Sequence, residues 1–251
     1  MASRIQRIEV AFSDMGGAAL EQFTPRERQK LEFKNARRVQ RSIVTGAEKK
    51  VLRWLAERMP TWINSDHLTA LGFAAQLMVG VSYALSRYNL HWLWAACVFL
   101  FLNWFGDSLD GTLARFRDQQ RPRYGFYVDH IIDSVGAAFL CGGLAFSGYM
   151  TPLIAMVLLM AFLLLSIETY LATYCLGEFY LSHFLLGPTE IRLVLAIGNV
   201  ALWYKPHVHF LNSVFLLFDV GGAIASIGML GMLVVTAIRH TAVLFKEERL
   251  P

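Results

Sequence analysis

The stretch Gly106–Ser134, GDSLDGTLARFRDQQRPRYGFYVDHIIDS, decides the fold of this chain. Four of its aspartates adjoin apolar runs, because HWLWAACVFLFLNWF leads into the stretch and VGAAFLCGGLAFSG follows it closely. If each run is a helix, Asp107 and Asp110 lie one turn apart on the first helix. Asp129 and Asp133 lie one turn apart on the second in the same way. The pattern therefore predicts two consecutive helices that each carry an acidic pair on one face.

These aspartates need a partner if the helices cross a membrane. A carboxylate at the bilayer centre costs about 2.5–3.5 kcal/mol on insertion scales, so four of them oppose insertion unless their charge is offset. A divalent cation offers such an offset, because magnesium, manganese and calcium prefer hard oxygen ligands. The alternative is that the aspartates are solvated at the helix ends and pair with the arginines of residues 115–123. The repeated spacing favours the metal site, and Gly111 and Gly125 would let a metal-bound phosphate approach the backbone closely.

This stretch resembles the signature of the CDP-alcohol phosphotransferases, which make phospholipids in membranes. The matching positions are Asp107-x-x-Asp110-Gly111-x-x-Ala114-Arg115 and then Gly125-x-x-x-Asp129-x-x-x-Asp133. Nine residues separate Arg115 from Gly125, a gap one residue longer than the family usually has. The difference concerns the loop between the helices and leaves the spacing within each helix intact.

The resemblance implies a transferase of phospholipid biosynthesis that cleaves the pyrophosphate of a CDP-alcohol. Such an enzyme passes the phospho-alcohol half to a hydroxyl acceptor and releases CMP. The cofactor implied is magnesium or manganese, as two ions held by Asp107, Asp110 and Asp129. Asp133 would be the base for the acceptor hydroxyl while also touching one metal. The positions implied to contact the CDP moiety are Gly111, Ala114, Arg115 and Gly125.

Three further polar residues are candidates for contact with the acceptor or with lipid: His130, Glu190 and Arg192. His130 directly follows Asp129, and a structural role is its alternative. Glu190 follows Gly187-Pro188-Thr189 at an expected helix start, where proline and an acidic residue are also ordinary capping chemistry. Glu190 and Arg192 would nevertheless be charges at membrane depth beside an anionic substrate.

The identity of the two substrates stays open at this point. One arrangement joins a CDP-linked small alcohol, such as CDP-choline or CDP-ethanolamine, to diacylglycerol. The other joins CDP-diacylglycerol to inositol phosphate, glycerol phosphate or serine. Asp129-His130-x-x-Asp133 and Gly187–Glu190 are similar to stretches of the choline/ethanolamine phosphotransferases, which slightly favours the first arrangement.

Two other classes of protein compete with an enzyme. A membrane transporter can also line an ion site with intramembrane carboxylates, although transporters more often show repeated halves. A non-catalytic scaffold is less compatible with an intact acidic set. For the enzyme, the expected partners are a CDP-alcohol, its lipid or polar acceptor and membrane lipids, with no nucleic acid. The sequence is compatible with a homodimer but does not decide the oligomeric state.

The composition is that of a polytopic membrane protein. Of 251 residues, 55% are hydrophobic and 17% are charged, and the mean hydropathy is +0.43. We expect an all-α, polytopic membrane helical bundle of about six transmembrane helices, which forms a catalytic domain over residues 61–251. Each span is near the ~20 residues that a bilayer requires. The spans are expected at residues 66–86, 91–116, 124–147, 150–175, 187–204 and 218–243, with Asp66 as the N-cap of the first.

A basic segment precedes these spans. Between Arg26 and Arg58 the chain has eleven Lys or Arg against four Glu, which favours a surface near anionic lipid over a nucleic-acid site. Thr45-Gly-Ala-Glu48 has the form of a capping box, and it opens an expected interfacial amphipathic helix that ends at Pro60. Residues 1–60 are thus expected to be a cytosolic basic segment. By the positive-inside rule the 116–123 loop is cytosolic too, so the aspartate site would face the cytosol.

Overall fold

The computed structural model of the protein describes residues 37–39, 45–176, 178–180, 187–210 and 213–248. The chain divides into two compact units, residues 1–37 and residues 38–251. Nearly all of the first unit lies outside the described residues, so the following account concerns the second. Much of the predicted basic segment, including residues 26–36, also lies outside them, and its location stays a prediction.

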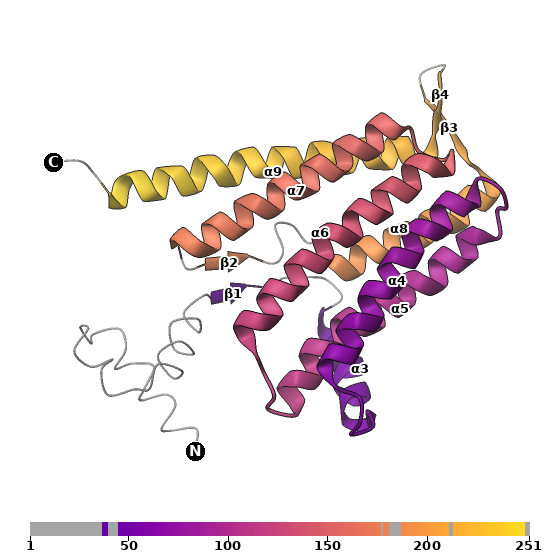
Figure 1. Cartoon of the computed structure of the whole chain (residues 1–251). Coiled ribbons are helices and arrows are strands. Elements are labelled where there is room, and N and C mark those ends of the chain that lie inside the picture. Colours follow the sequence, from indigo (N-terminus) through magenta and orange to yellow (C-terminus); the bar gives the residue numbers. More distant parts are fainter. Residues whose placement is uncertain (1–36, 40–44, 177, 181–186, 211–212, 249–251) are drawn as a thin grey trace, which may run out of the picture. The chain divides into compact units, whose positions relative to one another are not determined.

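Helices occupy all six of the predicted spans, and a shorter helix precedes them (Figure 1). Five of the six are long and apolar enough to cross a membrane by length and composition, and the protein is a multi-pass integral membrane protein. The remaining helix, α8, has 17 residues, which is the lower limit for a membrane span. The prediction of an all-α polytopic bundle is confirmed. The helices are α3 (Thr45–Arg58), α4 (Ser65–Ser86), α5 (Trp92–Phe116), α6 (Pro122–Ser147), α7 (Pro152–Leu176), α8 (Pro188–Tyr204) and α9 (Leu217–Glu247).

Short strands that the sequence analysis did not predict also occur in the described part of the chain. They are β1 (Arg37–Val39), β2 (Glu178–Tyr180), β3 (His207–Phe210) and β4 (Ser213–Leu216). The last two pair antiparallel, with His207 opposite Leu216, and form a hairpin between α8 and α9 (Figure 1). The N–H of Leu217 donates to the carbonyl oxygen of Pro206 at 3.0 Å and closes the base of this hairpin.

Facing glycines let α4 pack closely against both α5 and α6. Gly72 of α4 meets Gly106 of α5, where an added Cβ at Gly106 would lie 2.5 Å from the Gly72 nitrogen. Gly80 of α4 meets Gly143 of α6, where an added Cβ at Gly143 would lie 2.0 Å from the Gly80 carbonyl oxygen. Small residues permit such approaches between membrane helices. Helix α4 thus sets the separation of α5 and α6, the two helices that carry the aspartates.

Apolar side chains form two clusters in the bundle. One joins the C-terminal parts of α4 and α6 to the N-terminal parts of α5 and α9, and it includes Tyr83, Leu100, Leu144 and Phe218. The second cluster joins α3 to the other ends of α4 and α5. It consists of Leu52, Ala56, Leu68, Leu109 and Leu113. The acidic part of α5 thus follows the first cluster along the helix and overlaps the second, of which Leu109 is a member.

Helix α3 packs against α5 with part of its apolar face. Leu52 is buried in the second cluster, whereas its apolar neighbour Val51 is 47% exposed. Trp54 is also exposed, at 52%. The predicted helix is confirmed, but the side that it buries against protein is centred on Leu52 and Ala56.

Arg117, at the end of α5, forms hydrogen bonds with the loop between α3 and α4. Its guanidinium donates to the backbone carbonyl oxygens of Met59 at 3.0 Å, Pro60 at 2.9 Å and Ile63 at 2.6 Å. A planar guanidinium presents several donors in a fixed geometry, so one side chain can satisfy this whole turn. The turn after α3 therefore depends on a residue more than fifty positions later in the chain.

The prediction that Asp66 is the N-cap of the first span is wrong. Asn64 is the N-cap, with an extended backbone (φ −100°, ψ 165°), and its N–H donates to Nδ1 of His67 at 3.2 Å. A cap residue needs a non-helical backbone, and the helix already begins at Ser65. Asp66 lies in the first turn and forms an ion pair with Arg121, next to the start of α6.

Substitution of Gly143 tests the close crossing of α4 and α6. Gly143→Leu should destabilise the protein by ~3 kcal/mol or more, because its side chain would meet the Gly80 backbone, which cannot yield as a side chain can. Gly142→Leu is the matched control, since a Cβ there would meet nothing within 4 Å. The measurement is thermal unfolding of each purified variant in detergent. Equal unfolding temperatures for the two variants would contradict the crossing.

Candidate active site

The four predicted aspartates line one cavity, which lies between α4, α5 and α6. Asp107 and Asp110 reach it from α5, and Asp129 and Asp133 reach it from α6. The remaining lining residues are Thr69, Gly72 and Phe73 of α4, Asn103 of α5 and Ile132 of α6. The structure thus brings together four aspartates that are up to 26 positions apart in the sequence, as their helical spacing predicts.

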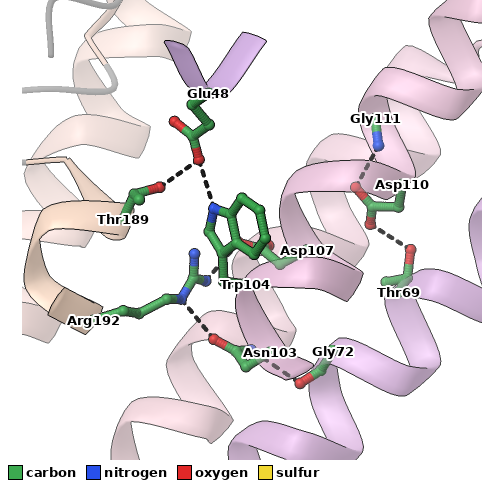
Figure 2. A network of polar contacts seen from close by, with 10 residues as sticks. All are labelled: Glu48, Thr69, Gly72, Asn103, Trp104, Asp107, Asp110, Gly111, Thr189 and Arg192. Carbon is green, nitrogen blue, oxygen red and sulfur yellow. Dashed lines mark hydrogen bonds and ion pairs between the residues drawn. The ribbon is translucent and has the colours of Figure 1, made fainter. Parts of the chain in front are cut away.

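The carboxylates differ in their exposure. Asp110 is 8% exposed, and its Oδ2 accepts a hydrogen bond from the Thr69 hydroxyl at 2.6 Å (Figure 2). Its Oδ1 accepts a second hydrogen bond from the Gly111 N–H. The side chain of Asp107 is 37% exposed, and Asp129 and Asp133 are exposed. Asp110 is therefore the most enclosed of the four, while the two carboxylates of α6 remain accessible to a ligand.

Arg192 of α8 contacts this acidic cavity directly. Its Nη2 lies 2.5 Å from Oδ2 of Asp107, and its Nε donates to Oδ1 of Asn103 at 2.7 Å (Figure 2). Asp110, Asp129 and Asp133 line the same cavity as Asp107, so their negative charges repel one another. In an environment of low dielectric constant such repulsion is strong, and a nearby cation reduces it. Arg192 is therefore part of what lets the carboxylates share one cavity.

A divalent metal ion fits the chemistry of these donors. Four carboxylates that face one cavity provide the hard oxygen ligands that magnesium and manganese prefer. Within the described ranges, however, no three His, Cys, Asp or Glu side chains lie close enough together to hold an ion as they stand. Arg192 occupies an oxygen of Asp107, and Thr69 and Gly111 donate to Asp110. A metal ion on Asp107 would thus compete with Arg192 for that carboxylate.

The residues expected to contact a nucleotide lie beside the cavity on α5 and α6. An added Cβ at Gly125 would meet nothing within 4 Å, and at Gly111 it would meet only the Arg115 guanidinium, at 3.5 Å. Packing among the described residues therefore does not require glycine at either position. Ala114 is half-buried, and Arg115 is exposed and donates from Nη2 to the Thr112 hydroxyl at 3.1 Å. The arrangement leaves room for a ligand along these helix ends.

A Schellman motif ends α5 directly after these residues. Asp118 has a left-handed backbone (φ 54°), and the N–H of Gln119 donates to the carbonyl oxygen of Ala114 at 2.9 Å. The N–H of Asp118 donates to the carbonyl oxygen of Arg115 at 3.3 Å. The loop between the helices is thus residues 117–121, and each acidic pair lies within one continuous helix.

The three candidate acceptor contacts have different surroundings. His130 packs between Phe126 and Tyr170, with ring centroids 4.1 Å and 4.7 Å away, and its Nδ1 is hydrogen-bonded to the Phe126 carbonyl oxygen. Glu190 is buried, and its Oε2 accepts the N–H of Gly187 at 2.9 Å, which is the capping chemistry weighed as its alternative. Arg192, by contrast, reaches an aspartate of the cavity.

Sequence reasoning missed Asn103, which connects α4, α5 and α8. It is 5% exposed and lies one turn before Asp107. Its Nδ2 donates to the carbonyl oxygen of Gly72 at 2.9 Å, so its Oδ1 is turned toward Arg192. An amide inside an otherwise apolar run was the signal that could have identified it.

Glu48 forms another long-range contact near the site. Its Oε1 accepts hydrogen bonds from Nε1 of Trp104 and from the hydroxyl of Thr189, both at 2.7 Å (Figure 2). The predicted capping box also depends on the side chain of Thr45, which lies outside what the structure describes. Glu48 joins α3 to α5 and α8. Nothing local in the sequence indicates these partners, because they are 56 and 141 residues away.

Comparison with known proteins agrees with this geometry. The family model described as CDP-alcohol phosphatidyltransferase matches residues 62–238, a range that includes the whole cavity. A search of curated proteins finds no match to the chain. Members of the matched family use CDP-alcohols and lipid substrates in membranes and generally depend on a divalent metal. Since the match covers well over half of the chain and all four aspartates, the chain belongs to the CDP-alcohol phosphatidyltransferase family.

Proposed function

We propose that this protein transfers the phospho-alcohol group of a CDP-alcohol to a hydroxyl acceptor and releases CMP. The observation that carries the proposal is the single cavity lined by Asp107, Asp110, Asp129 and Asp133. All four come from the α5–α6 hairpin, whereas transporter sites usually form between repeated halves of a chain. The acidic set therefore favours two-metal phosphoryl transfer over transport.

The residues have distinct expected roles in this reaction. Asp107, Asp110 and Asp129 would hold two magnesium or manganese ions, with Asp133 at the edge of that set. When bound, the ions would neutralise the pyrophosphate and stabilise the leaving phosphate of CMP. Arg115 offers a planar guanidinium to a phosphate or to cytosine.

Asp133 is the best-placed base for the acceptor hydroxyl. It is exposed in the cavity and lies one turn beyond Asp129 on α6. The acceptor oxygen would bond to the phosphorus that carries the alcohol, while the bond from that phosphorus to the bridging oxygen breaks. The electron pair of that bond leaves with CMP, and the hydroxyl proton passes to Asp133. Proximity contributes more than basicity here, because a carboxylate is a weak base.

For the substrates, we propose a CDP-linked small alcohol, such as CDP-choline or CDP-ethanolamine, as donor and diacylglycerol as acceptor. The support is the similarity of Asp129-His130-x-x-Asp133 and Gly187–Glu190 to the choline/ethanolamine branch. The second candidate is CDP-diacylglycerol with inositol phosphate, glycerol phosphate or serine. Incubating the purified protein with each CDP-alcohol and a total lipid extract, then identifying the products by mass, separates the two. CMP release without magnesium, or with no CDP-alcohol at all, would contradict both.

We expect Asp107→Asn, Asp110→Asn and Asp129→Asn each to abolish CMP release, because each removes a charged metal ligand. The measurement is release of CMP at saturating magnesium, with manganese affinity of each variant measured in parallel. Asp118→Asn is the matched control, since Asp118 lies in the loop and asparagine tolerates its left-handed backbone. Any of the three variants that keeps full activity would not be a ligand.

Asp133→Asn should separate the base from the metal ligands. We expect this variant to bind CDP-alcohol and metal but to transfer at least ~100-fold more slowly, the lower range for general acid–base catalysis. The test compares nucleotide affinity with turnover in the same preparation. If affinity falls as far as turnover, Asp133 is a metal ligand first, and His130 and Glu190 become the next candidates for the base.

We also propose that the site opens to the cytosol and that α3 lies on the same side. Lys49 and Arg53 of α3 are exposed, as is Arg87 in the turn between α4 and α5. In a background without Cys97, Cys141 and Cys175, single cysteines at Lys49 and Arg53 should react with a membrane-impermeant thiol reagent from the cytosolic side. A cysteine at Arg87 should react from the opposite side. Labelling of Lys49→Cys from that opposite side would refute this orientation.

A further inference from the structure

The Arg192 side chain is strongly fixed but incompletely paired. It is 12% exposed and comes from α8, outside the hairpin that carries the aspartates. Nη2 contacts Asp107 and Nε contacts Asn103, whose own amide is held by the Gly72 carbonyl oxygen. The guanidinium thus reaches the cavity from α8, and the oxygens of Asp107 and Asn103 fix two of its three nitrogens.

The third nitrogen of the guanidinium, Nη1, finds no acceptor within the part of the chain that the structure describes. Nη1 of Arg192 is buried and makes no hydrogen bond to the residues that the structure describes. A buried N–H group without a partner is unfavourable, and native structures usually provide one. In addition, Arg192 occupies the same carboxylate that a metal ion would need. Both features indicate that the guanidinium has a second position or a missing ligand.

We propose that Arg192 is an exchangeable counter-ion of the metal site. Before metal binds, the guanidinium neutralises Asp107 and allows the carboxylates to share the cavity. When a divalent ion takes the Asp107 oxygen, the freed guanidinium donates to a phosphate oxygen, which accepts the N–H of Nη1. The phosphate half of this proposal rests on the proposed function, whereas the competition for Asp107 does not.

A phosphate oxygen is the ligand chemistry that suits this group. A guanidinium matches the geometry of phosphate oxygens with two parallel donors, and charge-assisted bonds of this kind are strong. Asn103 would hold Nε while the two terminal nitrogens exchange their partners. The phosphate could belong to the pyrophosphate of the donor or to a phosphorylated acceptor, and the experiment below separates these sources.

The first arm measures manganese binding to the purified protein without nucleotide, by electron paramagnetic resonance of free Mn²⁺. Arg192→Gln should bind Mn²⁺ at least ~5-fold more tightly than the unmodified protein, the lower range for coupling between two bound groups. Arg87→Gln, an exposed arginine in the turn before α5, should leave the affinity unchanged. If Arg192→Gln binds Mn²⁺ with unchanged affinity, or as weakly as Asp107→Asn, the exchange is wrong and Arg192 only supports the fold or the ligands.

The second arm measures phosphate binding at saturating Mn²⁺, with CDP and glycerol 3-phosphate as separate probes. Arg192→Lys keeps the charge but lacks the paired donors, so it tests this point even if Arg192→Gln does not fold. A loss of ~10-fold or more in CDP affinity assigns the donor pyrophosphate, and a loss confined to glycerol 3-phosphate assigns the acceptor. No loss for either probe would overturn the phosphate contact.

The outcome for the exchange is independent of the outcome for the reaction. CMP release by the unmodified protein tests the proposed function, whereas Mn²⁺ titration needs no turnover. A protein that releases no CMP from any CDP-alcohol, yet binds Mn²⁺ more tightly as Arg192→Gln, would lose the proposed function and keep the exchange. If the unmodified protein releases CMP normally but Arg192→Gln binds Mn²⁺ with unchanged affinity, the proposed function is kept and the exchange is lost.

Discussion

Repulsion among four carboxylates in one cavity is the constraint on which the rest of this structure depends. In water such charges cost little, but among membrane helices their repulsion is several-fold stronger. Contacts from three separate helices reduce this repulsion. Thr69 of α4 donates to Asp110, Arg192 of α8 pairs with Asp107, and Asn103 of α5 holds that arginine in place. Hydrogen-bond donors and a positive charge beside the acidic hairpin thus reduce the repulsion among its carboxylates.

The second requirement is that the two acidic helices keep a fixed separation. Carboxylates on different helices can share a ligand only if their backbones are held within a narrow range of distances. Helix α4 provides this by packing glycine against glycine on both sides, at Gly72 with Gly106 and at Gly80 with Gly143. Gly72 also uses its carbonyl oxygen to orient Asn103. Gly72 of α4 thereby helps to set the spacing of the helices, and through Asn103 it also helps to position Arg192 beside the carboxylates.

The helices and the clustering of the aspartates could be predicted from the sequence, because both depend on local patterns. Apolar runs of about twenty residues give the spans, and a spacing of three or four residues puts two carboxylates on one helix face. The partners of Glu48 and the hairpin between α8 and α9 could not be predicted in the same way. Glu48 fits a capping box locally, but tertiary contacts with Trp104 and Thr189 determine the orientation of its side chain. The Asp66 prediction failed for a different reason: Asn64 is an equally favoured cap residue, and the helix begins directly after it, at Ser65.

The contacts of Glu48 explain how a short helix such as α8 can position a charge of the acidic cavity. Helix α8 has 17 residues and begins at Pro188, so Arg192 lies in its second turn, where a helix end would ordinarily fray. Two glutamates prevent this. Glu190 accepts the Gly187 N–H within the helix start, and Glu48 holds Thr189 from α3. Because Arg192 lies only two positions after Glu190, the backbone that carries its side chain is held in place even if the terminal nitrogens of the guanidinium change partners. Helix α3 therefore does more than lie beside the bundle: through Glu48 it helps to fix the residue that neutralises Asp107.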